Sequence, residues 1–513
     1  MRQIFFCLIA CTALMFGAFA QRSENKKACI PCDKMKSIQL PDVTIIKTEA
    51  LPSDSIKSPV PWIPTQFIRV PFCRVTGYIS KEIFFELILP ANWNGRFLMA
   101  GNGGFAGKIQ NDKYAYVDQG YALSATNTGH KADDETDASW ALNNMERQLN
   151  FGKLGVHRTA VTSKALINSY YCSYPSYSYF VGCSRGGGQA LMEAQEYPED
   201  FNGIVSGAPA FDWTGMGAKH LQITKMMYPD PKKLKTIFTL DHLKILQDQV
   251  MQQCDKLDGL DDKIINNPLA CKPDLSKLPL CPDNQASPNC FTNQQIEAIK
   301  AVYEPKLIEG KQFYPGIPPG LEADPSSWQL WLSGNDNYPF PALAYSFGTN
   351  LFKFLIYNNP DWDYSQFNFD SYPKDSKYAA SFLNATNPDY SNFKKQNGKM
   401  IIFHGWNDPV ISAISTIDHY EQAMKLDSGI PSHIRLFLLP GVLHCGEGTG
   451  PDMVDWVKQI KDWVENNKAP ERIVVSKIEN GKTVMTRPVF PYPKLAAYNG
   501  SGDPKDEKNF SAR

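Results

Sequence analysis

The segment 177–201 sets the strongest limit on the fold, because an apolar strand pattern runs into a glycine-rich turn and then into a helical pattern. Its first residues, YSYFV, are mostly aromatic or β-branched, as expected of a buried strand. Gly182-Cys183-Ser184-Arg185-Gly186 follows, and GGQALMEAQEYPEDF then shows helical spacing of apolar residues. A Gly-x-Ser-x-Gly turn between a strand and a helix lifts its serine above an α/β sheet. We therefore predict an α/β fold with Ser184 as a nucleophile, rather than as a structural turn residue.

A serine nucleophile needs a base to accept its proton and a carboxylate to orient that base. In this architecture the order along the chain is serine, acid and then histidine. KMIIFHGWNDPV places Asp408 just after an apolar strand, and HIRLFLLPGVLHCG places His444 just after another. Ligands meet open α/β sheets at these strand ends. We predict Ser184, Asp408 and His444 as a catalytic triad.

The other histidines that follow the serine are given structural roles. His404 lies within the end of its strand, so we expect a packed, hydrogen-bonded side chain. The rest are expected on the surface: His220, His242, His419 and His433.

The first twenty residues predict export. Arg2 precedes a short apolar run, and Ala18-Phe19-Ala20 fits a signal cleavage pattern before Gln21. The run is short for a retained membrane anchor, so we expect a secreted or periplasmic protein with no membrane contact after cleavage. Removing residues 1–20 leaves ten cysteines, an even number that suggests five disulfides in an oxidising compartment.

One of these cysteines, Cys183, directly precedes Ser184, and another, Cys445, directly follows His444. A disulfide holds two α-carbons about 5.5–6 Å apart. A Cys183–Cys445 bridge would therefore bring the serine and the histidine within reach of each other. We predict this clamp in preference to a thiol nucleophile at Cys183, which would have to stay unpaired in an oxidising compartment.

The remaining cysteines are assigned less completely. Short spacing suggests the local pairs Cys254–Cys271 and Cys281–Cys290. Cys32 and Cys73 are also assigned to disulfides, while the pairing of Cys29 and Cys172 stays open. A zinc site at Cys29-x-x-Cys32 is a weak alternative, because no second ligand pair of matching spacing follows it.

A glycine loop offers donors for the negative oxygen that forms during acyl transfer. GRFLMAGNGGFAG reads as an apolar strand that ends in Gly101-Asn102-Gly103-Gly104, early in the chain where such hydrolases carry their oxyanion loop. The backbone N–H of Gly103 or Gly104, together with that of Arg185, would form the oxyanion hole. An ordinary glycine turn is the alternative.

Composition excludes some function classes. Lys+Arg number 52 and Asp+Glu number 53, so no charge excess points to nucleic acid or to an anionic membrane. With 513 residues the chain has enough material for more than one module. Its last residues, 496–513, are polar, and we expect a loose tail.

Taken together, these motifs resemble the tannase and feruloyl esterase family. The resemblance rests on Cys183-Ser184, Asp408 and His444-Cys445, with NGRFLMAGNGGFAG, TNTGH and FNGIVSGAPAFDW as further similar segments. It covers about residues 70–474. It implies an α/β-hydrolase core at 41–210 and 380–495, with a lid at 211–379 inserted between the serine and the aspartate.

The resemblance also implies a serine carboxylesterase that acts on small aromatic esters, with no organic cofactor. Galloyl, feruloyl and mono(2-hydroxyethyl) terephthalate esters are all substrates within the family. Arg185 and Gly188 depart from residues often found at these positions, which leaves the preferred acid open. A non-catalytic binding protein on the same fold is the alternative from another class, and the oligomeric state is undetermined.

Two features of the presumed lid complete the expectations. CDKLDGLDDKIINNPLAC crowds four aspartates around a glycine, and composition alone favours a solvated acidic turn as much as a cation site. The resemblance implies a structural calcium site there, with side-chain ligands Asp255, Asp258 and Asp262 and carbonyl ligands Leu260 and Ile264. The aromatic segment 328–364 would form either the core of the lid or a cover over an aromatic acyl pocket.

Overall fold

The computed structural model describes residues 25–58, 63–334 and 341–513. The predicted signal peptide lies outside these residues, as does the middle of the aromatic segment 328–364. No helix in the described part of the chain is long and apolar enough to cross a membrane.

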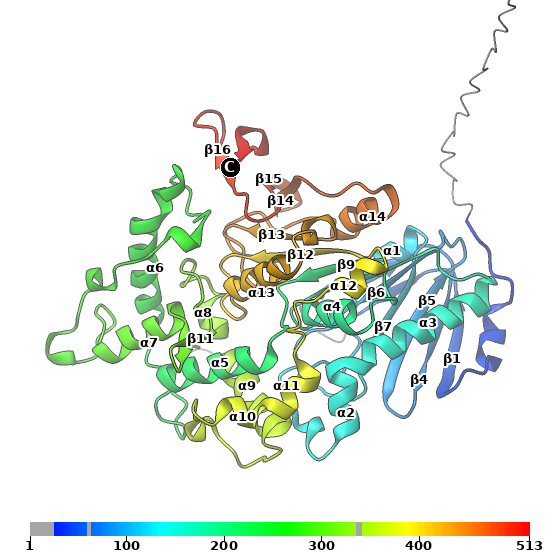
Figure 1. Ribbon diagram of the computed structural model, residues 1–513, viewed down its shortest axis with the longest axis horizontal. Coiled ribbons are helices and arrows are strands. Elements are labelled where there is room, and N and C mark those ends of the chain that lie inside the picture. Colours follow the sequence, from blue (N-terminus) through cyan, green and yellow to red (C-terminus); the bar gives the residue numbers. More distant parts are fainter. Residues whose placement is uncertain (1–24, 59–62, 335–340) are drawn as a thin grey trace, which may run out of the picture.

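A nine-stranded mixed sheet forms the centre of the molecule (Figure 1). Six neighbouring strands are parallel, and three antiparallel strands extend one edge. In spatial order the strands are β1 (Val43–Leu51), β4 (Phe72–Ile79), β5 (Ile83–Pro90), β7 (Ala122–Thr126), β6 (Arg96–Ala100), β8 (Tyr177–Cys183), β9 (Gly203–Gly207), β12 (Lys399–Gly405) and β13 (Ile434–Leu439). Every residue of β7, β9 and β12 is buried, as is typical of parallel strands covered on both faces.

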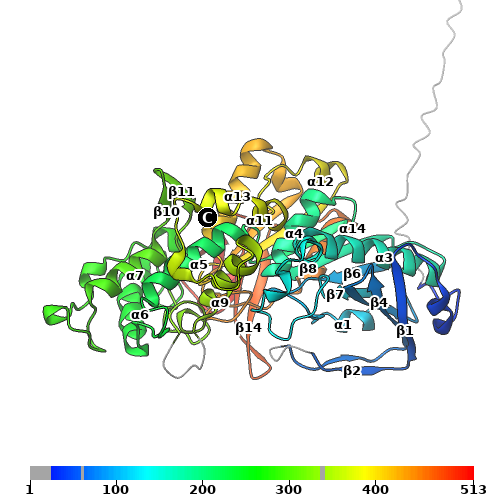
Figure 2. The same cartoon turned by 90° about the horizontal axis from the view of Figure 1, so that it is seen from below.

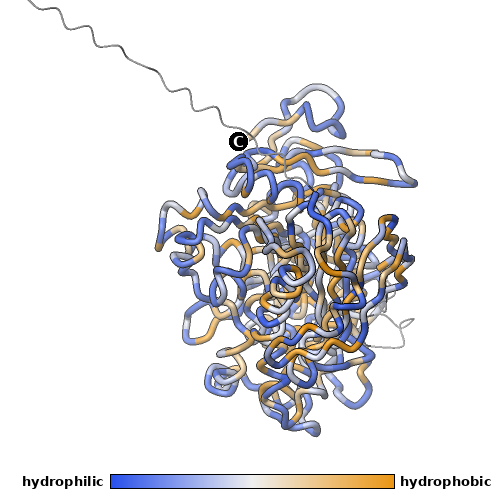
Figure 3. The backbone as a smooth tube through the Cα atoms, turned by 90° about the vertical axis from the view of Figure 1, so that its right-hand side faces the viewer, coloured by the Kyte–Doolittle hydropathy of each residue, from blue (hydrophilic) through white to orange (hydrophobic). Residues whose placement is uncertain are grey.

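Helices cover both faces of this sheet. On one face, α3 (Gly155–Tyr171), α4 (Arg185–Glu196) and α13 (Ala413–Leu426) share a buried apolar cluster with the strands. On the other face, α1 (Ala115–Asp118) and α14 (Trp456–Asn466) contribute to a second cluster. In Figure 3, apolar segments run through the centre of the molecule, whereas the outer loops are mostly hydrophilic. This layered arrangement agrees with the predicted α/β architecture.

Most of the chain between β9 and β12 folds beside the sheet, on the left in Figures 1 and 2, around an apolar cluster that it shares with residues of 105–151, while α12 (Ser391–Lys395) packs against the sheet through Phe393. The helices and strands before α12 are α5 (Trp213–Met227), α6 (Leu240–Cys254), α7 (Asn293–Tyr303), β10 (Lys306–Ile308), β11 (Lys311–Tyr314), α8 (Trp328–Trp331), α9 (Leu343–Asn350), α10 (Tyr372–Asp375) and α11 (Lys377–Leu383). Trp328, Phe352 and Trp362 are buried in this cluster. Much of the aromatic segment is therefore a hydrophobic core.

Shorter elements complete the fold. They are α2 (Met145–Leu149), the pair β2 (Asp54–Ile56) and β3 (Gln66–Ile68), and the hairpin β14 (Ile473–Glu479) and β15 (Lys482–Val489).

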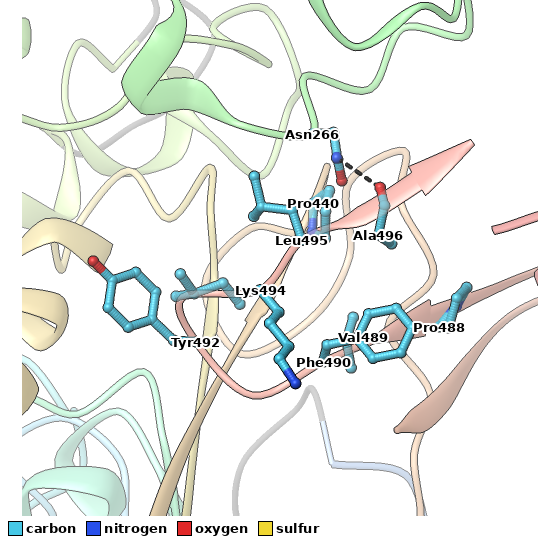
Figure 4. Close-up of a pocket in the computed structure, with 10 residues that line it drawn as sticks. Asn266, Pro440, Pro488, Val489, Phe490, Tyr492, Lys494, Leu495 and Ala496 are labelled. Atoms are coloured by element: carbon cyan, nitrogen blue, oxygen red, sulfur yellow. Dashed lines mark hydrogen bonds between the residues drawn. The ribbon is translucent and has the colours of Figure 1, made fainter. Parts of the chain in front are cut away.

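The C-terminal residues are docked on the protein, so the expectation of a loose tail is wrong. β16 (Ala496–Tyr498) pairs with β17 (Phe510–Ala512), and Phe510 is buried 4.7 Å from the Arg487 guanidinium. Asn266 donates a 2.9 Å hydrogen bond to the carbonyl of Ala496 (Figure 4). The cavity beside them is only about 10 Å³, enough for one water at most. A buried aromatic ring, a hydrogen bond and one strand pair therefore order this segment despite its polar composition.

Five disulfides pair all ten cysteines that follow residue 20. The predicted pairs Cys183–Cys445, Cys254–Cys271 and Cys281–Cys290 are confirmed. The structure also forms Cys32–Cys73 and, settling the open pairing, Cys29–Cys172. Because Cys29 and Cys32 belong to different disulfides, the alternative of a zinc site at this pair is wrong.

Candidate active site

Ser184 sits in a strained turn between β8 and α4, at the carboxyl edge of the parallel strands. Its φ is 61° and its ψ is −121°, a backbone conformation that residues other than glycine rarely adopt. The turn is also crowded, because a Cβ on Gly182 would lie 2.6 Å from the carbonyl carbon and oxygen of Gly186. The glycines of the motif are therefore required for the two backbone segments to approach and for the serine to be presented at the helix N-terminus.

Asp408 and His444 meet above the same edge of the sheet. The His444 Nδ1 lies 2.7 Å from Asp408 Oδ2. The other carboxylate oxygen, Oδ1, accepts backbone hydrogen bonds from Val410 at 2.9 Å and Ile411 at 3.0 Å. These contacts fix the carboxylate, and through it the orientation of the His444 ring.

A second histidine supports the same carboxylate. His404 is fully buried, with Nε2 3.2 Å from Asp408 Oδ2 and Nδ1 2.9 Å from Thr416 Oγ1. It is packed and hydrogen-bonded as predicted, but its contact with Asp408 was not anticipated. Burial by itself would raise the pKa of Asp408, yet the neighbouring His444 and His404 lower this pKa below its ordinary range. Asp408 is therefore an anion despite being fully enclosed.

The Cys183–Cys445 disulfide joins the loops that carry the serine and the histidine, with 6.0 Å between the two α-carbons. Within the described residues, the Ser184 hydroxyl and His444 share no hydrogen bond. Such contacts are often long before a substrate binds and tighten in the complex. The bridge restrains the two loops while leaving this final contact to form.

The glycine loop after β6 meets only part of the expectation for an oxyanion hole. The backbone N–H of Gly103 donates to Gln110 Oε1 and is therefore occupied. In the part of the chain that the structure describes, the N–H groups of Gly104 and Arg185 make no such bond. Gly104 has a positive φ of 51°, and a Cβ there would lie 2.6 Å from the carbonyl oxygen of Glu135. Of the two loop candidates, Gly104 is the one with a free donor.

Aromatic side chains extend from the catalytic histidine into the inserted segment. The Trp331 ring lies edge-on to His444, with 5.1 Å between ring centroids, and stacks at 6.2 Å on Phe347. Phe347 in turn lies 5.5 Å from Phe105, the residue that follows Gly104. Sequence reasoning found the aromatic density of the segment but could not identify Trp331 as the ring beside His444.

The side chain of Arg185 points away from solvent, although its backbone N–H is a candidate oxyanion donor. Its guanidinium lies 4.3 Å from the Phe151 ring and 5.5 Å from the Trp213 ring, and it donates to the carbonyls of Phe151 and Gly152. No carboxylate pairs with it in the described part of the chain, and burial lowers the pKa of Arg185 to about 9. The arginine side chain at this position is thus an internal packing feature.

The expectation of surface positions for the remaining histidines is largely wrong. His220, His242 and His419 are all buried. His220 Nε2 lies 3.0 Å from the carbonyl of Val410, beside the triad acid, and His419 Nε2 lies 2.8 Å from the Tyr390 hydroxyl. Each of these buried histidines has a hydrogen bond from a distant segment to one ring nitrogen, whereas the Nδ1 of His220 has no partner among the described residues.

Among the described residues, one group of side chains has the spacing to hold a metal ion. His157, Glu193 and Asp200 have ligand atoms within 4.8 Å of one another. However, Asp200 Oδ2 is already 2.6 Å from His157 Nδ1, and Asp200 Oδ1 is 3.4 Å from Lys164 Nζ. Burial and the neighbouring Asp200 raise the pKa of Glu193. The oxygens of Asp200 are therefore already paired, and the group forms a network of interacting ionisable side chains beside α3 and α4.

Comparison with known proteins places this geometry in a family. The chain matches the family described as "Tannase and feruloyl esterase" over residues 66–512. It is 31% identical over 551 residues to an uncharacterised esterase of Xanthomonas campestris pv. campestris, covering 97% of this chain and 93% of that protein. Feruloyl esterase B of Aspergillus niger is 30% identical over 473 residues, with 86% of this chain and 87% of that protein covered.

Solved structures agree with the sequence comparisons. The crystal structure of feruloyl esterase B from Aspergillus oryzae matches with a TM-score of 0.83 and 26% identity, covering 94% of this chain and 99% of that one. The predicted fold class is thereby confirmed, and so is the resemblance that the paired cysteine motif indicated. The chain belongs to the tannase and feruloyl esterase family of carboxylic ester hydrolases.

Proposed function

We propose that this protein is an exported serine esterase that hydrolyses esters of aromatic acids through an acyl-enzyme on Ser184. The observation that carries the proposal is the His444–Asp408 pair, with 2.7 Å between Nδ1 and Oδ2, joined to the Ser184 turn by the Cys183–Cys445 disulfide. The histidine is oriented by a buried anion and restrained beside a serine on a strained turn. These are the parts that nucleophilic acyl transfer requires.

In the proposed mechanism, Ser184 Oγ attacks the ester carbonyl carbon while its proton passes to His444 Nε2. Asp408 stabilises the imidazolium that results. The tetrahedral intermediate expels the alcohol, which takes the proton from His444, and leaves the acid esterified to the serine. Water then attacks this ester with His444 as base, which releases the acid and restores the serine.

The developing oxygen anion is assigned to the backbone N–H groups of Gly104 and Arg185. Both donors are free among the described residues, and Arg185 stands at the N-terminus of α4, where the helix dipole favours negative charge. Gly103 is left out because Gln110 accepts its N–H.

The aromatic acid is assigned to the side of the site that Trp331, Phe347 and Phe105 border. Their rings form a continuous series from His444 to the residue after the oxyanion loop. Planar acyl groups gain from such surroundings through area burial and ring contacts. We keep 41–210 and 380–495 as the core and 211–379 as the lid in this proposal.

Two experiments test the function. An organophosphonate should label Ser184 in the wild type and fail to label Ser184→Ala, and an unlabelled wild type would favour a non-catalytic binding protein. A panel of galloyl, feruloyl and terephthaloyl esters should then show hydrolysis of at least one aromatic series well above acetyl esters. The terephthalate monoester is the second candidate substrate, because the same ring-lined wall would accept it.

A structural calcium ion is proposed for the acidic loop after α6. Asp255 Oδ1 is buried without a hydrogen-bond partner among the described residues. Burial and neighbouring aspartates raise the pKa of both Asp255 and Asp258, so a cation would relieve these carboxylates.

The chemistry of the donor set suits a hard cation, but its carboxylates do not yet have the close spacing of the His157 group and already accept backbone hydrogen bonds from Leu260, Lys263 and Ile264, so they would move together on binding. The proposed ligands are side chains of Asp255, Asp258 and Asp262 with carbonyls of Leu260 and Ile264. Asp262 Oδ2 accepts a 2.7 Å bond from Arg487, so this carboxylate would share its charge between the arginine and the ion. The ion would hold the loop closed beside the Cys254–Cys271 disulfide, with no part in the acyl transfer.

A further inference from the structure

Glu135 is a carboxylic acid packed directly on the oxyanion loop. Its carbonyl oxygen accepts the N–H of Phe105 at 2.7 Å. Its Oε2 lies 3.5 Å from Gln110 Nε2, and Gln110 in turn holds the N–H of Gly103. A Cβ built on Gly103 would lie 3.8 Å from the same carboxylate oxygen. Glu135 therefore stands next to the loop that an ester carbonyl must approach, and it does so through its side chain as well as its backbone.

The surroundings of this carboxyl group contain few balancing charges. Burial, followed by the neighbouring Asp134, raises the pKa of Glu135 to about 7, while His444, Gln110 and Lys108 act in the opposite direction. The Lys108 ammonium donates instead to the carbonyl of Asp133, at 2.6 Å. Glu135 is half-buried and forms no salt bridge among the described residues. Its negative charge, once formed, thus lies beside the oxyanion loop without a paired cation among the described residues.

The position of Phe105 connects this charge with the acid portion of a substrate. Phe105 follows Gly104, is hydrogen-bonded to the Glu135 backbone, and belongs to the ring series that reaches His444. Phe105 itself is enclosed, so an aromatic acid would bind at the partly exposed Trp331 end of the series, where we place its ring substituents within reach of the Glu135 charge. Two like charges about 10 Å apart repel by enough to change an equilibrium by about tenfold at an effective dielectric constant of about 20.

We propose that Glu135 is a specificity-determining residue that selects esters of uncharged aromatic acids over esters of aromatic acids that carry a second carboxylate. This inference rests on the proposed esterase function. It divides the two candidate substrate classes, because a feruloyl or galloyl group is uncharged on its ring near neutral pH and a terephthalate monoester is an anion. The lid rings would accept both, and Glu135 rejects the second.

The test uses a pair of substrates, dimethyl terephthalate and monomethyl terephthalate, which share the ring and a methyl ester, and compares the ratio of their rates between enzymes, because the diester has a second methyl ester where the monoester has a carboxylate. For the wild type at about pH 8, kcat/KM should favour the neutral diester. Glu135→Gln should reduce this preference about fivefold to tenfold. Asp133→Asn, which removes the same charge from an exposed neighbour on the same loop, should leave the preference unchanged.

The pH dependence separates a charge effect from a structural one. Because the raised pKa makes Glu135 neutral in acid, the wild-type preference should weaken between about pH 8 and about pH 5.5, where the monoester is still ionised. In Glu135→Gln the preference should not change over this range, since effects on His444 cancel in the ratio of the two substrates.

Two results would overturn the inference. An equal preference in wild type and Glu135→Gln, with both variants folded by circular dichroism, would show that Glu135 does not select by charge. A wild-type preference that does not change with pH would also show that Glu135 does not select by charge. A wild type that hydrolyses neither ester, nor any other ester of the panel, would instead overturn the proposed function itself.

Discussion

Asp408, at the edge of the central sheet, and the aspartates of the acidic loop after α6 lie in surroundings that affect their charge in opposite ways. Asp408 is completely buried, yet its pKa is lowered, because His444, His404 and two backbone N–H groups face it. Burial raises the pKa of Asp255 and Asp258, and neighbouring aspartates add to this shift. Burial raises the pKa of all three carboxyl groups, and only Asp408 has the cationic and hydrogen-bonding partners that reverse this shift.

The difference separates chemistry from stability. The Asp408 charge is satisfied by protein groups and is therefore available to orient a base. The loop charges are left partly unsatisfied, and the calcium ion that we propose there would stabilise the loop without taking part in the reaction. We therefore expect substitutions at the sheet edge to change turnover, and substitutions in the loop to change melting.

The largest effect is expected for Asp408→Asn. The amide keeps the shape of the carboxylate but loses the charge that holds the His444 tautomer, so kcat should fall by about 10⁴-fold. Steady-state kinetics on a good aromatic ester measures this. Asp261→Asn in the loop, where the side chain is exposed, serves as a matched control. A loss below tenfold in Asp408→Asn would contradict the assignment of the triad acid.

The double variant Cys183→Ala/Cys445→Ala is expected to rank second. It leaves Ser184 and His444 unchanged but releases their loops, and small misplacements of reacting groups cost about a hundredfold in rate. The assay is run well below the melting temperature of the variant. Cys281→Ala/Cys290→Ala, which opens a lid disulfide, should lower melting without that loss of turnover. Equal turnover in both double variants would reduce the active-site bridge to a purely structural role.

A smaller and more selective effect is expected for Trp331→Ala. Removal of the ring beside His444 should lower kcat/KM for aromatic esters by about tenfold and leave acetyl esters within about twofold, because aromatic contacts contribute about 0.5–1.5 kcal/mol beyond area burial. Tyr378→Ala, an exposed aromatic of the same insert, is the control. Equal losses on both ester types would show that Trp331 supports folding and does not select the acid.

The smallest effect, but one that reverses sign, is expected for Asp258→Asn. With calcium present the variant loses a ligand, so Tm should fall by roughly 2 °C. After chelation it loses a repelled charge instead, so Tm near pH 7 should rise by a similar amount. The sign follows from the raised pKa, since stability from such a group is present in acid and lost as pH rises through that pKa. If the Tm of the wild type and of Asp258→Asn does not depend on calcium, the loop is a solvated acidic turn and holds no cation.

The lowered pKa of Asp408 gives the opposite dependence. A carboxylate with a folded-state pKa below its ordinary value contributes stability that is present above the unfolded pKa of about 3.9, and that contribution disappears as acid protonates the folded state. When calcium is chelated, mild acidification from neutral pH should therefore increase the stability that the loop contributes. The stability that Asp408 contributes should be lost only in stronger acid.

The sequence by itself determined the parts of this protein that depend on local order. The strand, turn and helix around Ser184, the acid and base after two later strands, and the short-range disulfides could all be predicted, because neighbouring residues impose their backbone and spacing. The clamp at Cys183 and Cys445 was predictable as well, since both cysteines adjoin residues that must meet.

Only the tertiary structure decided which groups satisfy one another across the fold. Gln110 occupies the N–H of Gly103, Trp331 lies against His444, and buried histidines fill positions expected at the surface. The polar C-terminus docks through Phe510 and Asn266 for the same reason. Burial and hydrogen-bond partners depend on contacts between segments that are far apart in the chain. Composition and residue spacing do not show where those segments meet, so these contacts could not be predicted.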